Sequence, residues 1–346
     1  MLTTSGERLA EKVARRFFLD RQAEFWLGEL RRTWSLSEIR AQVVDVVVQT
    51  RDTKTFVLRP NARWRGHRAG QHTTVELEID GVRVRRCYSI SSAPGERLLS
   101  ITVKRVPQGR VSCWMHEHLN RGDVIRLGPA AGDFVLSEPA PAKLLLLSGG
   151  SGITPVMSIL RDLAARGAAH DVVFVHHAHR RDDVIFRSEL GALAARHRGL
   201  RVFLCSSDDP AGRFDEALLA RRVPDFAERQ TLLCGPPGFM ARVERMWERA
   251  SATARLQRER FVAPPRRTAD ERRVRVCAGS ASLLELLERA GERPPYGCRV
   301  GICHTCTARK HSGTVQNLVT GVVSNQPDED IQLCICVPRS DVELGL

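Results

Sequence analysis

Hydrophobic and polar positions along the chain divide it into segments with different predicted secondary structure. Over residues 7–34 apolar side chains recur at helical spacing while charges fill the other face, which predicts an amphipathic helix. Between residues 41 and 135, short apolar runs punctuated by Gly and Pro predict an antiparallel β-barrel, interrupted by a helix over 112–119. The strands predicted there are Val43–Val48, Thr55–Leu58, Thr73–Ile79, Val82–Val84, Leu99–Val103 and Val124–Arg126.

From Lys143 the pattern changes to strands that alternate with helices, which is typical of a parallel sheet. The predicted strands are Leu144–Ser148, Val172–His176, Arg201–Cys205 and Thr231–Cys234, and the predicted helices cover 155–166, 184–196, 213–221 and 237–249. A Pro-rich, charged linker and a small α+β module follow, with strands at Val274–Cys277 and Gln332–Val337 and a helix over Ser282–Ala290. We therefore expect an extension over 1–37, a barrel over 38–138, an α/β domain over 139–262, a linker over 263–273 and a last domain over 274–346.

Composition and charge narrow the class of protein. Hydrophobic residues make up 42% and charged residues 27% of the 346 residues, so wholesale disorder is excluded. No apolar run approaches the roughly 20 residues of a membrane-spanning helix, and the N-terminus lacks the apolar core of a signal peptide. We therefore predict a cytoplasmic protein. The net charge of +13 is spread along the chain without a nucleic-acid motif, so we expect no nucleic-acid partner.

Five of the ten cysteines crowd into the last fifty residues, which suggests a metal site. Cys298, Cys303 and Cys306 have the C-x4-C-x2-C spacing of plant-type [2Fe-2S] ferredoxins, with a further Cys about thirty residues on. A zinc knuckle would use paired C-x2-C units instead. Cys334 and Cys336 are both candidates for the fourth ligand, because residues two apart on a strand face the same way.

A second motif lies at the end of a predicted barrel strand. Arg86-Cys-Tyr88-Ser89, followed by Ile90, resembles the R-x-Y-[ST] flavin motif of the ferredoxin–NADP reductase family. The resemblance implies that Arg86 pairs with a flavin phosphate, Tyr88 covers the flavin ring, and Ser89 hydrogen-bonds near its reactive nitrogen.

A helix that follows this motif is the candidate seat for a diphosphate. Gly109, Val111 and Ser112 open the helix, and free N–H groups at a helix N-terminus bind phosphate. The family holds the FAD diphosphate there, whereas FMN lacks this second phosphate, so we expect FAD.

Two glycine-containing turns in the α/β region resemble the nucleotide-binding turns of the same family. Ser148-Gly-Gly-Ser-Gly-Ile-Thr-Pro155 joins a buried strand to a helix, and its glycines remove Cβ atoms where a dinucleotide phosphate approaches the backbone. The second turn, Cys234-Gly-Pro-Pro, is similar to the segment that lies near the nicotinamide in the family.

The choice between NADPH and NADH stays open, with NADPH favoured. Arg180, Arg181 and Arg187 supply cations that suit a 2′-phosphate. The segment 206–209 (Ser-Ser-Asp-Asp) instead lacks the Arg that NADPH enzymes often place there, and acidic groups near a ribose suit NADH.

Together, four motifs in the same order cover residues 40–346 and resemble a ferredoxin–NADP reductase-type flavoprotein fused to a β-grasp ferredoxin domain. The N-terminal extension makes the chain most similar to the actinobacterial reductases of acyl-CoA desaturases. The resemblance implies catalytic roles for Tyr88, Ser89 and Cys234. It implies cofactor contacts from Arg86, Tyr88, Ser89, Ile90, Gly109, Val111, Ser112, Gly149, Gly150, Gly152, Thr154, Pro155, Arg180, Arg181, Arg187, Gly235 and Pro236. The Leu-x-Cys ending of the family implies Cys334 as the fourth cluster ligand, beside Cys298, Cys303 and Cys306.

The implied function is that of an NAD(P)H oxidoreductase carrying FAD and a [2Fe-2S] cluster. FAD accepts a hydride and releases its electrons one at a time, as the cluster requires. The acceptor implied is an external oxygenase, a membrane-bound di-iron acyl-CoA (stearoyl-CoA) desaturase. Alternative acceptors are an alkane hydroxylase, a cytochrome P450 and a ring-hydroxylating oxygenase. A flavin and iron–sulfur redox sensor would need an effector element, and we find none.

The helix predicted for residues 7–34 has two interpretations. Its basic amphipathic character suits peripheral contact with the inner face of the cell membrane, where it would help the protein to dock with a membrane-bound acceptor. Alternatively, its apolar stripe packs on the barrel and its charges face water.

Overall fold

The computed structural model describes residues 29, 31–79, 81–107, 109–167, 171–209, 214–261, 273–296, 299, 301 and 306–346, and it divides the chain into two compact units, Met1–Glu259 and Arg260–Leu346. The predicted N-terminal helix lies mostly outside the described residues. The prediction that this helix extends to residue 34 is wrong. Residues 31–34 form a turn instead, in which the Trp34 N–H donates a hydrogen bond to the Arg31 carbonyl at 2.8 Å. Within the described residues, no helix has the length and apolar character needed to cross a membrane.

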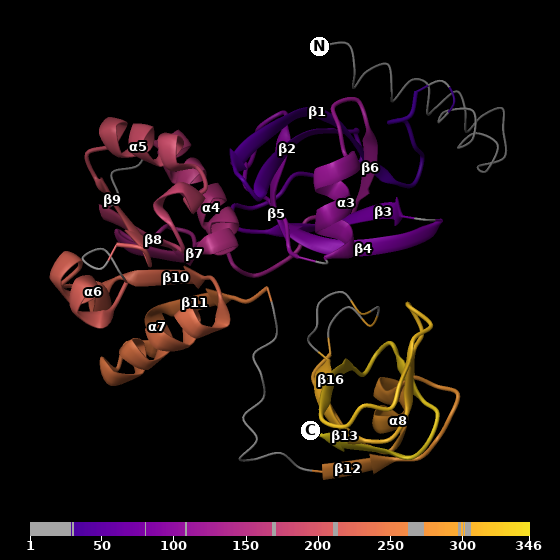
Figure 1. The fold of residues 1–346 in the computed structure, drawn as a ribbon. Coiled ribbons are helices and arrows are strands. Elements are labelled where there is room, and N and C mark those ends of the chain that lie inside the picture. The colour runs from indigo at the N-terminus through magenta and orange to yellow at the C-terminus, as the bar shows by residue number, and fades with distance from the viewer. Residues whose placement is uncertain are drawn as a thin grey trace. The chain divides into compact units, whose positions relative to one another are not determined.

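The first part of the N-terminal unit is the predicted antiparallel barrel (Figure 1). Its strands are β1 (Ile39–Thr50), β2 (Thr53–Pro60), β3 (His72–Ile79), β4 (Val82–Ser89), β5 (Leu99–Lys104) and β6 (Val124–Leu127), in the order β4-β3-β6-β1-β2-β5. A bridge between Ile90 and Ile101 joins the end of β4 to β5, so the predicted flavin motif sits where the two edge strands meet. Alternate side chains of every strand fill one apolar core.

Helix α3 (Arg110–His118) packs against the interior of this barrel. Val111 and Met115 are buried in the barrel core, and the His116 carbonyl accepts a hydrogen bond from Lys54 Nζ at 2.8 Å. The helix begins two residues earlier than predicted. This packing fixes the direction of its N-terminus.

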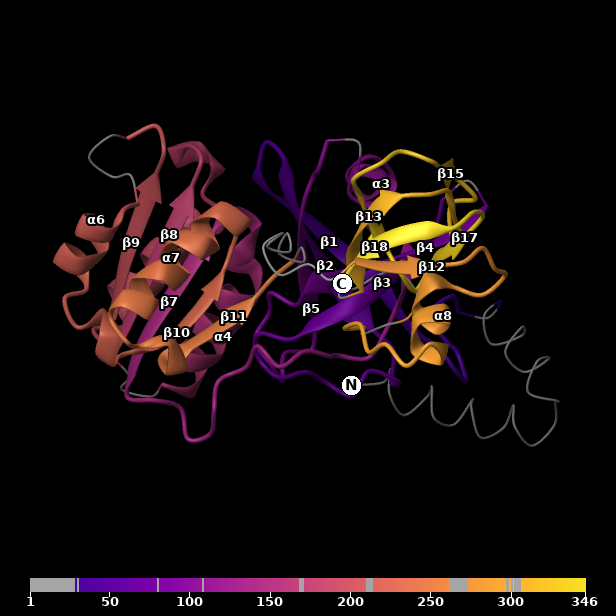
Figure 2. The same ribbon diagram turned by 90° about the horizontal axis from the view of Figure 1, so that it is seen from below.

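The second part of the N-terminal unit is a parallel sheet covered by helices on both faces (Figure 2). The strands are β7 (Lys143–Gly149), β8 (Asp171–Ala178), β9 (Leu200–Ser206), β10 (Gln230–Cys234) and β11 (Leu256–Glu259), in the order β11-β10-β7-β8-β9. The helices are α4 (Ile153–Arg166), α5 (Arg187–Arg196), α6 (Glu216–Arg222) and α7 (Pro237–Arg249), with short 3-10 turns η1 (Gly150–Gly152), η2 (Arg181–Asp183), η3 (Phe226–Glu228) and η4 (Thr253–Arg255). Alternating β7 side chains explain the two layers, since Leu144 and Leu146 pack with α4 while Leu145 and Leu147 pack with α7.

Two details of this sheet differ from the prediction. Strand β11 was not predicted, because its four residues Leu-Gln-Arg-Glu carry one apolar side chain. Helix α5 starts at Arg187 rather than 184, because Ile185 and Phe186 turn into the core and Phe186 adopts a φ of 60°.

In the described part of the C-terminal unit, two small sheets accompany one helix, α8 (Leu283–Arg289). The strands are β12 (Arg273–Val276), β13 (Thr307–Ser312), β14 (Val315–Asn317), β15 (Val323–Ser324), β16 (Glu329–Gln332), β17 (Cys336–Pro338) and β18 (Val342–Gly345). Their orders are β12-β18-β13-β16 and β15-β14-β17. The strand predicted over Gln332–Val337 is wrong, because residues 333–335 form a turn between β16 and β17. The three-domain fold class predicted from the sequence is confirmed.

Candidate functional site

The predicted flavin motif occupies the last residues of β4. Tyr88 packs against the barrel core, and burial raises the pKa of its phenol to about 12, so the side chain stays neutral. Arg86 is exposed, and its Nη1 donates to the Arg85 carbonyl at 2.8 Å. The Ser89 hydroxyl oxygen is buried and makes no hydrogen bond of good geometry in the described part of the chain, although it lies close enough to the Glu259 carboxylate to lower the pKa of that group. Such an orphaned polar atom beside a planar aromatic side chain fits the polar edge of a flavin.

The N-terminus of α3 fits the second predicted role, that of a diphosphate seat. Gly109 caps the helix without any side-chain hydrogen bond to its first turn. The Ser112 hydroxyl stabilises the loop that precedes the helix. It accepts a hydrogen bond from the Val106 N–H at 3.1 Å and donates one to the Gly109 carbonyl at 3.3 Å. Gly109 has no side chain that could occupy the N–H groups of the first turn, which suits an anionic ligand.

The two glycine turns of the sheet pack directly on each other. A Cβ on Gly152 would lie 2.3 Å from the Cys234 carbonyl oxygen, and a Cβ on Gly149 would lie 2.9 Å from a Pro236 ring carbon. Gly235 approaches the Gly149 backbone in the same way. These glycines are therefore required by the close contact between the two turns.

Gly150 differs from its neighbours in the turn. It adopts a φ of 52°, and a Cβ there would meet nothing within 4 Å. An open backbone position of this kind, just before α4, is where a phosphate can approach. Thr154 Oγ1 donates to the Ser151 carbonyl at 3.0 Å and Pro155 lies in the first turn of α4, so both fix the start of that helix.

The barrel and the sheet meet at a buried polar cluster formed by Ser89, Cys234 and Glu259. Cys234 and Glu259 are paired neighbours at the ends of β10 and β11. Burial raises the pKa of the Cys234 thiol well above its ordinary value, so the thiol is neutral. Burial also raises the pKa of Glu259, while His72 and Ser89 beside it act in the opposite direction. One Glu259 oxygen, like the Ser89 hydroxyl, is buried without a hydrogen-bond partner in the described chain.

The sequence did not point to Glu259 or to His72. His72 Nδ1 lies 3.8 Å from Glu259 Oε1, and the Cys87 sulfur and the Glu259 carboxylate raise the pKa of His72 to about 9. His72 pairs directly with Ser89 across β3 and β4. Glu259 ends the short strand β11, and the carboxyl ends of parallel strands meet at one edge of a sheet, but this strand was not predicted from the sequence.

Helix α4 fixes the sheet to the flavin strand. Ser158 Oγ donates to the Ser92 carbonyl at 2.7 Å, and Arg161 Nη1 donates to the Ser91 carbonyl at 2.5 Å. The same guanidinium forms a two-pronged ion pair with Glu189 of α5, at 2.7 and 2.6 Å. Two residues beyond Ser89, the backbone is therefore tied to the nucleotide domain, which holds the polar cluster together.

The cations predicted for a 2′-phosphate lie at the end of β8 and the start of α5. Arg180, Arg181 and Arg187 are all exposed, and Arg187 lies 3.9 Å from Asp182. Asp208, from the end of β9, lies close to them. Hydrogen bonds, above all from Ser206, and the nearby charge of Arg180 hold its pKa below the ordinary value. Cationic and anionic side chains thus share this edge of the sheet.

In the C-terminal unit, two of the four predicted cluster ligands are described. Cys306 directly precedes β13, and Cys334 lies in the turn between β16 and β17. Their sulfur atoms lie 3.2 Å apart. Two thiolates on one tetrahedral metal ion stand about 3.7 Å apart, given metal–sulfur bonds of about 2.3 Å. The two sulfur atoms therefore lie within about half an ångström of the separation that a shared iron requires, while Cys298 and Cys303 lie outside the described residues.

The same-face argument for Cys334 and Cys336 fails, because a turn separates them. Cys336 lies in β17 and pairs with Asn317 of β14. The loop that carries the other predicted ligands is held against the turn: Gln332 Nε2 donates to the Gly301 carbonyl at 2.9 Å. Gly301 has a φ of 77°, and a Cβ there would lie 2.6 Å from the Ile335 side chain, so glycine is needed for this approach.

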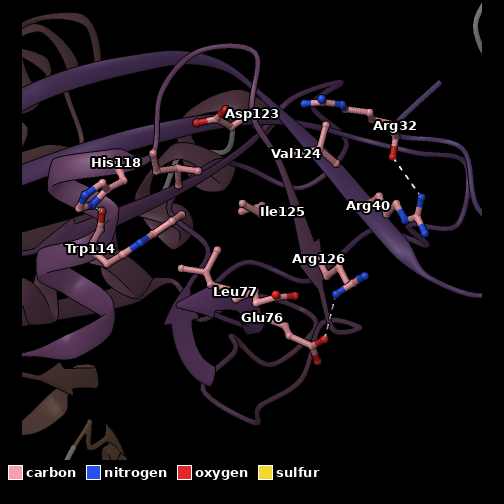
Figure 3. Close-up of a pocket in the computed structure, with 12 residues that line it drawn as sticks. Arg32, Arg40, Glu76, Leu77, Trp114, His118, Asp123, Val124, Ile125 and Arg126 are labelled. Carbon is pink, nitrogen blue, oxygen red and sulfur yellow. Dashed lines mark hydrogen bonds and ion pairs between the residues drawn. The ribbon is translucent and has the colours of Figure 1, made fainter. Parts of the chain in front are cut away.

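A pocket of about 520 Å³ on the barrel contains none of the predicted site residues (Figure 3). Trp114 and His118 of α3 form one wall, with their rings stacked at 5.4 Å. Arg126 on another wall pairs with Glu76 at 3.5 Å, and Arg40 donates to the Arg32 carbonyl at 3.3 Å. Two of the cations that line the pocket, Arg40 and Arg126, therefore already have partners.

Comparison with known protein families gives three matches in the order of the domains. Residues 40–135 match the oxidoreductase FAD-binding domain, residues 146–245 match the oxidoreductase NAD-binding domain, and residues 267–339 match the 2Fe-2S iron-sulfur cluster binding domain.

Individual proteins are similar over most or nearly all of the chain. An NADPH oxidoreductase of Mycobacterium tuberculosis is 34% identical, over 99% of this chain and 93% of its own length. The glycine betaine monooxygenase reductase subunit of Chromohalobacter salexigens is 31% identical, over 90% of this chain and 96% of its own. The solved structure of phthalate dioxygenase reductase has the same fold, with a TM-score of 0.62 and 23% identity over 88% of this chain and 96% of that one. The chain therefore belongs to the ferredoxin–NADP reductase-type oxidoreductases that bind FAD and NAD(P)H and carry a C-terminal [2Fe-2S] domain.

Proposed function

We propose that this chain takes electrons from NADPH and passes them, through its FAD and its [2Fe-2S] cluster, to a separate oxygenase. The observation that carries the proposal is the buried polar cluster of Ser89, Cys234 and Glu259. It joins the end of the flavin strand to the ends of two strands of the nucleotide sheet. A hydride donor and acceptor must be held within about 3–3.5 Å of each other, and a junction between their two binding domains is where this can occur.

FAD, when bound, accepts a hydride and releases single electrons. The residues of this chain bind and orient. Arg86 and the first turn of α3 would hold the phosphates of FAD, and Tyr88 would cover its ring. Ser89, whose hydroxyl lacks a partner in the described chain, would donate a hydrogen bond to the ring edge. The neutral thiol of Cys234 excludes water without adding charge.

On the nucleotide side, the turn around Gly150 would receive the diphosphate of NADPH at the N-terminus of α4. We propose that Arg180 and Arg181 bind the 2′-phosphate, with Arg187 nearby. The exposure of these side chains beside the sheet edge supports this role. The negative charge of Asp208 opposes binding of the 2′-phosphate. The distance between Asp208 and the bound ribose would therefore set how strongly NADPH is preferred over NADH.

We propose Cys298, Cys303, Cys306 and Cys334 as the cluster ligands. The short distance between the Cys306 and Cys334 sulfur atoms supports the second pair. Plant-type clusters have potentials near about −400 mV, low enough to drive an oxygenase.

For the acceptor we propose a membrane-bound acyl-CoA desaturase. The similar monooxygenase reductase supports an oxygenase in general, and the N-terminal extension supports the desaturase in particular. In this proposal the protein is cytoplasmic and its extension contacts the inner face of the membrane. The alternative acceptors are an alkane hydroxylase, a cytochrome P450 and a ring-hydroxylating oxygenase.

The test is reconstitution with defined acceptors. The purified holoprotein and NADPH would be added to membranes that contain an acyl-CoA desaturase and, separately, to a soluble ring-hydroxylating oxygenase. We expect desaturated product that is lost with the Cys334→Ser variant, and little turnover of the soluble oxygenase. Turnover of the soluble enzyme alone would contradict the desaturase assignment.

A further inference from the structure

A histidine of the barrel forms an ion pair with the carboxylate of the polar cluster. His72 begins β3, and its Nδ1 lies 3.8 Å from Oε1 of Glu259, the last residue of β11. The pair therefore joins the barrel to the parallel sheet. The Glu259 side chain is 14% exposed and that of His72 is 29% exposed, so the pair extends from the interior towards solvent. His72 has no role in the function proposed above.

The barrel holds the His72 side chain in place. The His72 N–H donates to the Ala131 carbonyl and the Ala131 N–H donates to the His72 carbonyl, each at 2.9 Å. Gly132 leaves room for the imidazole, because a Cβ at that position would lie 2.9 Å from Nδ1. Its φ of 109° also favours glycine. The ring is therefore packed against this backbone on the side of Nδ1.

The same loop holds the strand that carries Glu259. Gln257, two residues earlier on β11, donates from Nε2 to the Asp133 carbonyl at 2.6 Å. Residues two apart on a strand face the same way, so Gln257 and Glu259 both point towards the barrel. Three successive loop residues thus fix both partners of the ion pair. Residues 131 and 132 hold the histidine, and residue 133 holds the strand of the glutamate.

Few other charges act on the pair. Cys87 and Ser89 face it from β4 and Cys234 faces it from β10, and none of these side chains is a cation. The Cys87 sulfur and the Glu259 carboxylate raise the pKa of His72 to about 9, so the imidazole is charged at neutral pH. Within the described chain, His72 is the one cation that acts on the Glu259 carboxylate, while burial disfavours the ionised form of that group. The charge of His72 therefore favours a charged carboxylate at this junction.

We propose that His72 is a positioning residue for hydride transfer, which acts by keeping Glu259 ionised beside the nicotinamide. The proposal rests on the proposed function, because it concerns the junction at which NADPH would meet FAD. When NADPH gives up a hydride, one proton and two electrons leave together, and its nicotinamide ring gains a positive charge. A carboxylate held at that point stabilises the developing cation, provided that the carboxylate is not protonated.

The experiment compares two substitutions of His72 with a histidine control, all in the full-length holoprotein. His72→Gln removes the charge, whereas His72→Lys keeps a positive charge at the same position. His118→Gln makes the first change at an exposed histidine of α3 that stacks on Trp114. Stopped-flow absorbance measures the rate of flavin bleaching by saturating NADPH, over the pH range in which carboxyl and imidazole groups titrate.

We expect His72→Gln to change the pH profile of this rate and not its plateau at high pH. An opposite charge within about 4–6 Å lowers the pKa of a carboxyl group by about 1–3 units. The acid limb of the profile should therefore lie about 1–3 pH units higher in His72→Gln, which lowers the rate about tenfold or more on that limb. His72→Lys and His118→Gln should follow the wild-type profile.

A second measurement does not depend on turnover. Nuclear magnetic resonance follows the titration of the His72 imidazole in the wild type and in Glu259→Gln, both without NADPH, and the signal missing from His72→Gln assigns it. We expect the pKa of His72 to fall by about one unit or more in Glu259→Gln, because an anion beside it is lost. This measurement decides the question even if His72→Gln fails to retain FAD.

Other results would overturn the proposal. Equal pH profiles for the wild type and His72→Gln would show that His72 does not control the carboxylate. A rate lowered equally at every pH, without rescue by His72→Lys, would show that the imidazole acts through its shape. An unchanged titration of His72 in Glu259→Gln would show that the two groups are not paired. If NADPH fails to bleach the flavin of the wild type, the proposed function itself fails, whereas normal bleaching with unchanged variants rejects only the role of His72.

Discussion

Replacing Gly152 by Ala tests whether the contact between the two glycine turns forms the NADPH site. Gly152 has a helical φ of −63°, so an alanine backbone is tolerated and the whole effect comes from its Cβ. That atom would lie 2.3 Å from the Cys234 carbonyl oxygen and 2.7 Å from the Gly235 Cα. Ordinary contact begins near 3.4 Å, so the two turns must separate by more than an ångström.

The expected magnitude follows from this displacement. Overpacking of a close-packed interior lowers the free energy of unfolding by about 1–3 kcal/mol. A shift of roughly 1 Å between reacting groups lowers the rate by about a hundredfold. We therefore expect the kcat/KM for NADPH to fall about 10- to 100-fold, while FAD content stays unchanged because the atoms nearest to the new Cβ belong to Cys234 and Gly235 of the sheet.

The assay is steady-state ferricyanide reduction together with urea unfolding. Gly191→Ala is the matched control, because Gly191 lies within α5 and a Cβ there meets nothing within 4 Å. That variant should keep full activity and gain about 0.5–1 kcal/mol of stability, as alanine favours helix. A Gly152→Ala protein with the wild-type kcat/KM would refute the assignment of these turns to NADPH.

Three further predictions test the other sites. Arg86→Ala should weaken FAD binding by about 1.5–3 kcal/mol, the range for hydrogen bonds to charged groups, measured by flavin release on dilution. Arg85→Ala, the control on the neighbouring residue that pairs with Glu76, should retain FAD. Cys334→Ser should abolish or alter the [2Fe-2S] spectrum whereas Cys336→Ser should preserve it, and the reverse result would exchange their roles. Arg229 and Lys143 hold the pKa of Asp225 at about 2, so its ionised form stabilises the fold above about pH 4. Asp225→Asn should therefore lower the free energy of unfolding by about 1–2 kcal/mol at pH 7, allowing for solvent screening, and this difference should shrink as the pH falls from 4 towards 2.

The sequence predicted the main elements of the fold because their periodicity is strong. The apolar run of β7 and the glycine turn after it required a buried strand followed by a helix, as found. Strands such as β11 and β18 were missed because they are four residues long and depend on neighbours distant in sequence. The break between β16 and β17 was also missed, because an alternating run of residues cannot reveal that a turn interrupts it.

Sequence motifs located most residues of the candidate site, but they did not predict the cluster where the barrel and the parallel sheet meet. Tyr88, Ser89 and Cys234 were recognised from local patterns, whereas Glu259 joins them only through the parallel pairing of β10 with β11. The glycine turns were expected to admit a ligand. The structure adds that Gly152 is also required by the backbone of Cys234, a contact between segments about eighty residues apart. Such contacts depend on packing, which no local pattern encodes.

The central claim is that electrons pass from NAD(P)H to the flavin and then to the cluster on one chain. Anaerobic titration of the purified holoprotein with NADPH, followed by visible absorbance and electron paramagnetic resonance, tests it most directly. The account predicts that the flavin band bleaches and that the signal of a reduced [2Fe-2S] cluster grows with it. A fully bleached flavin beside a cluster that stays oxidised would contradict the account.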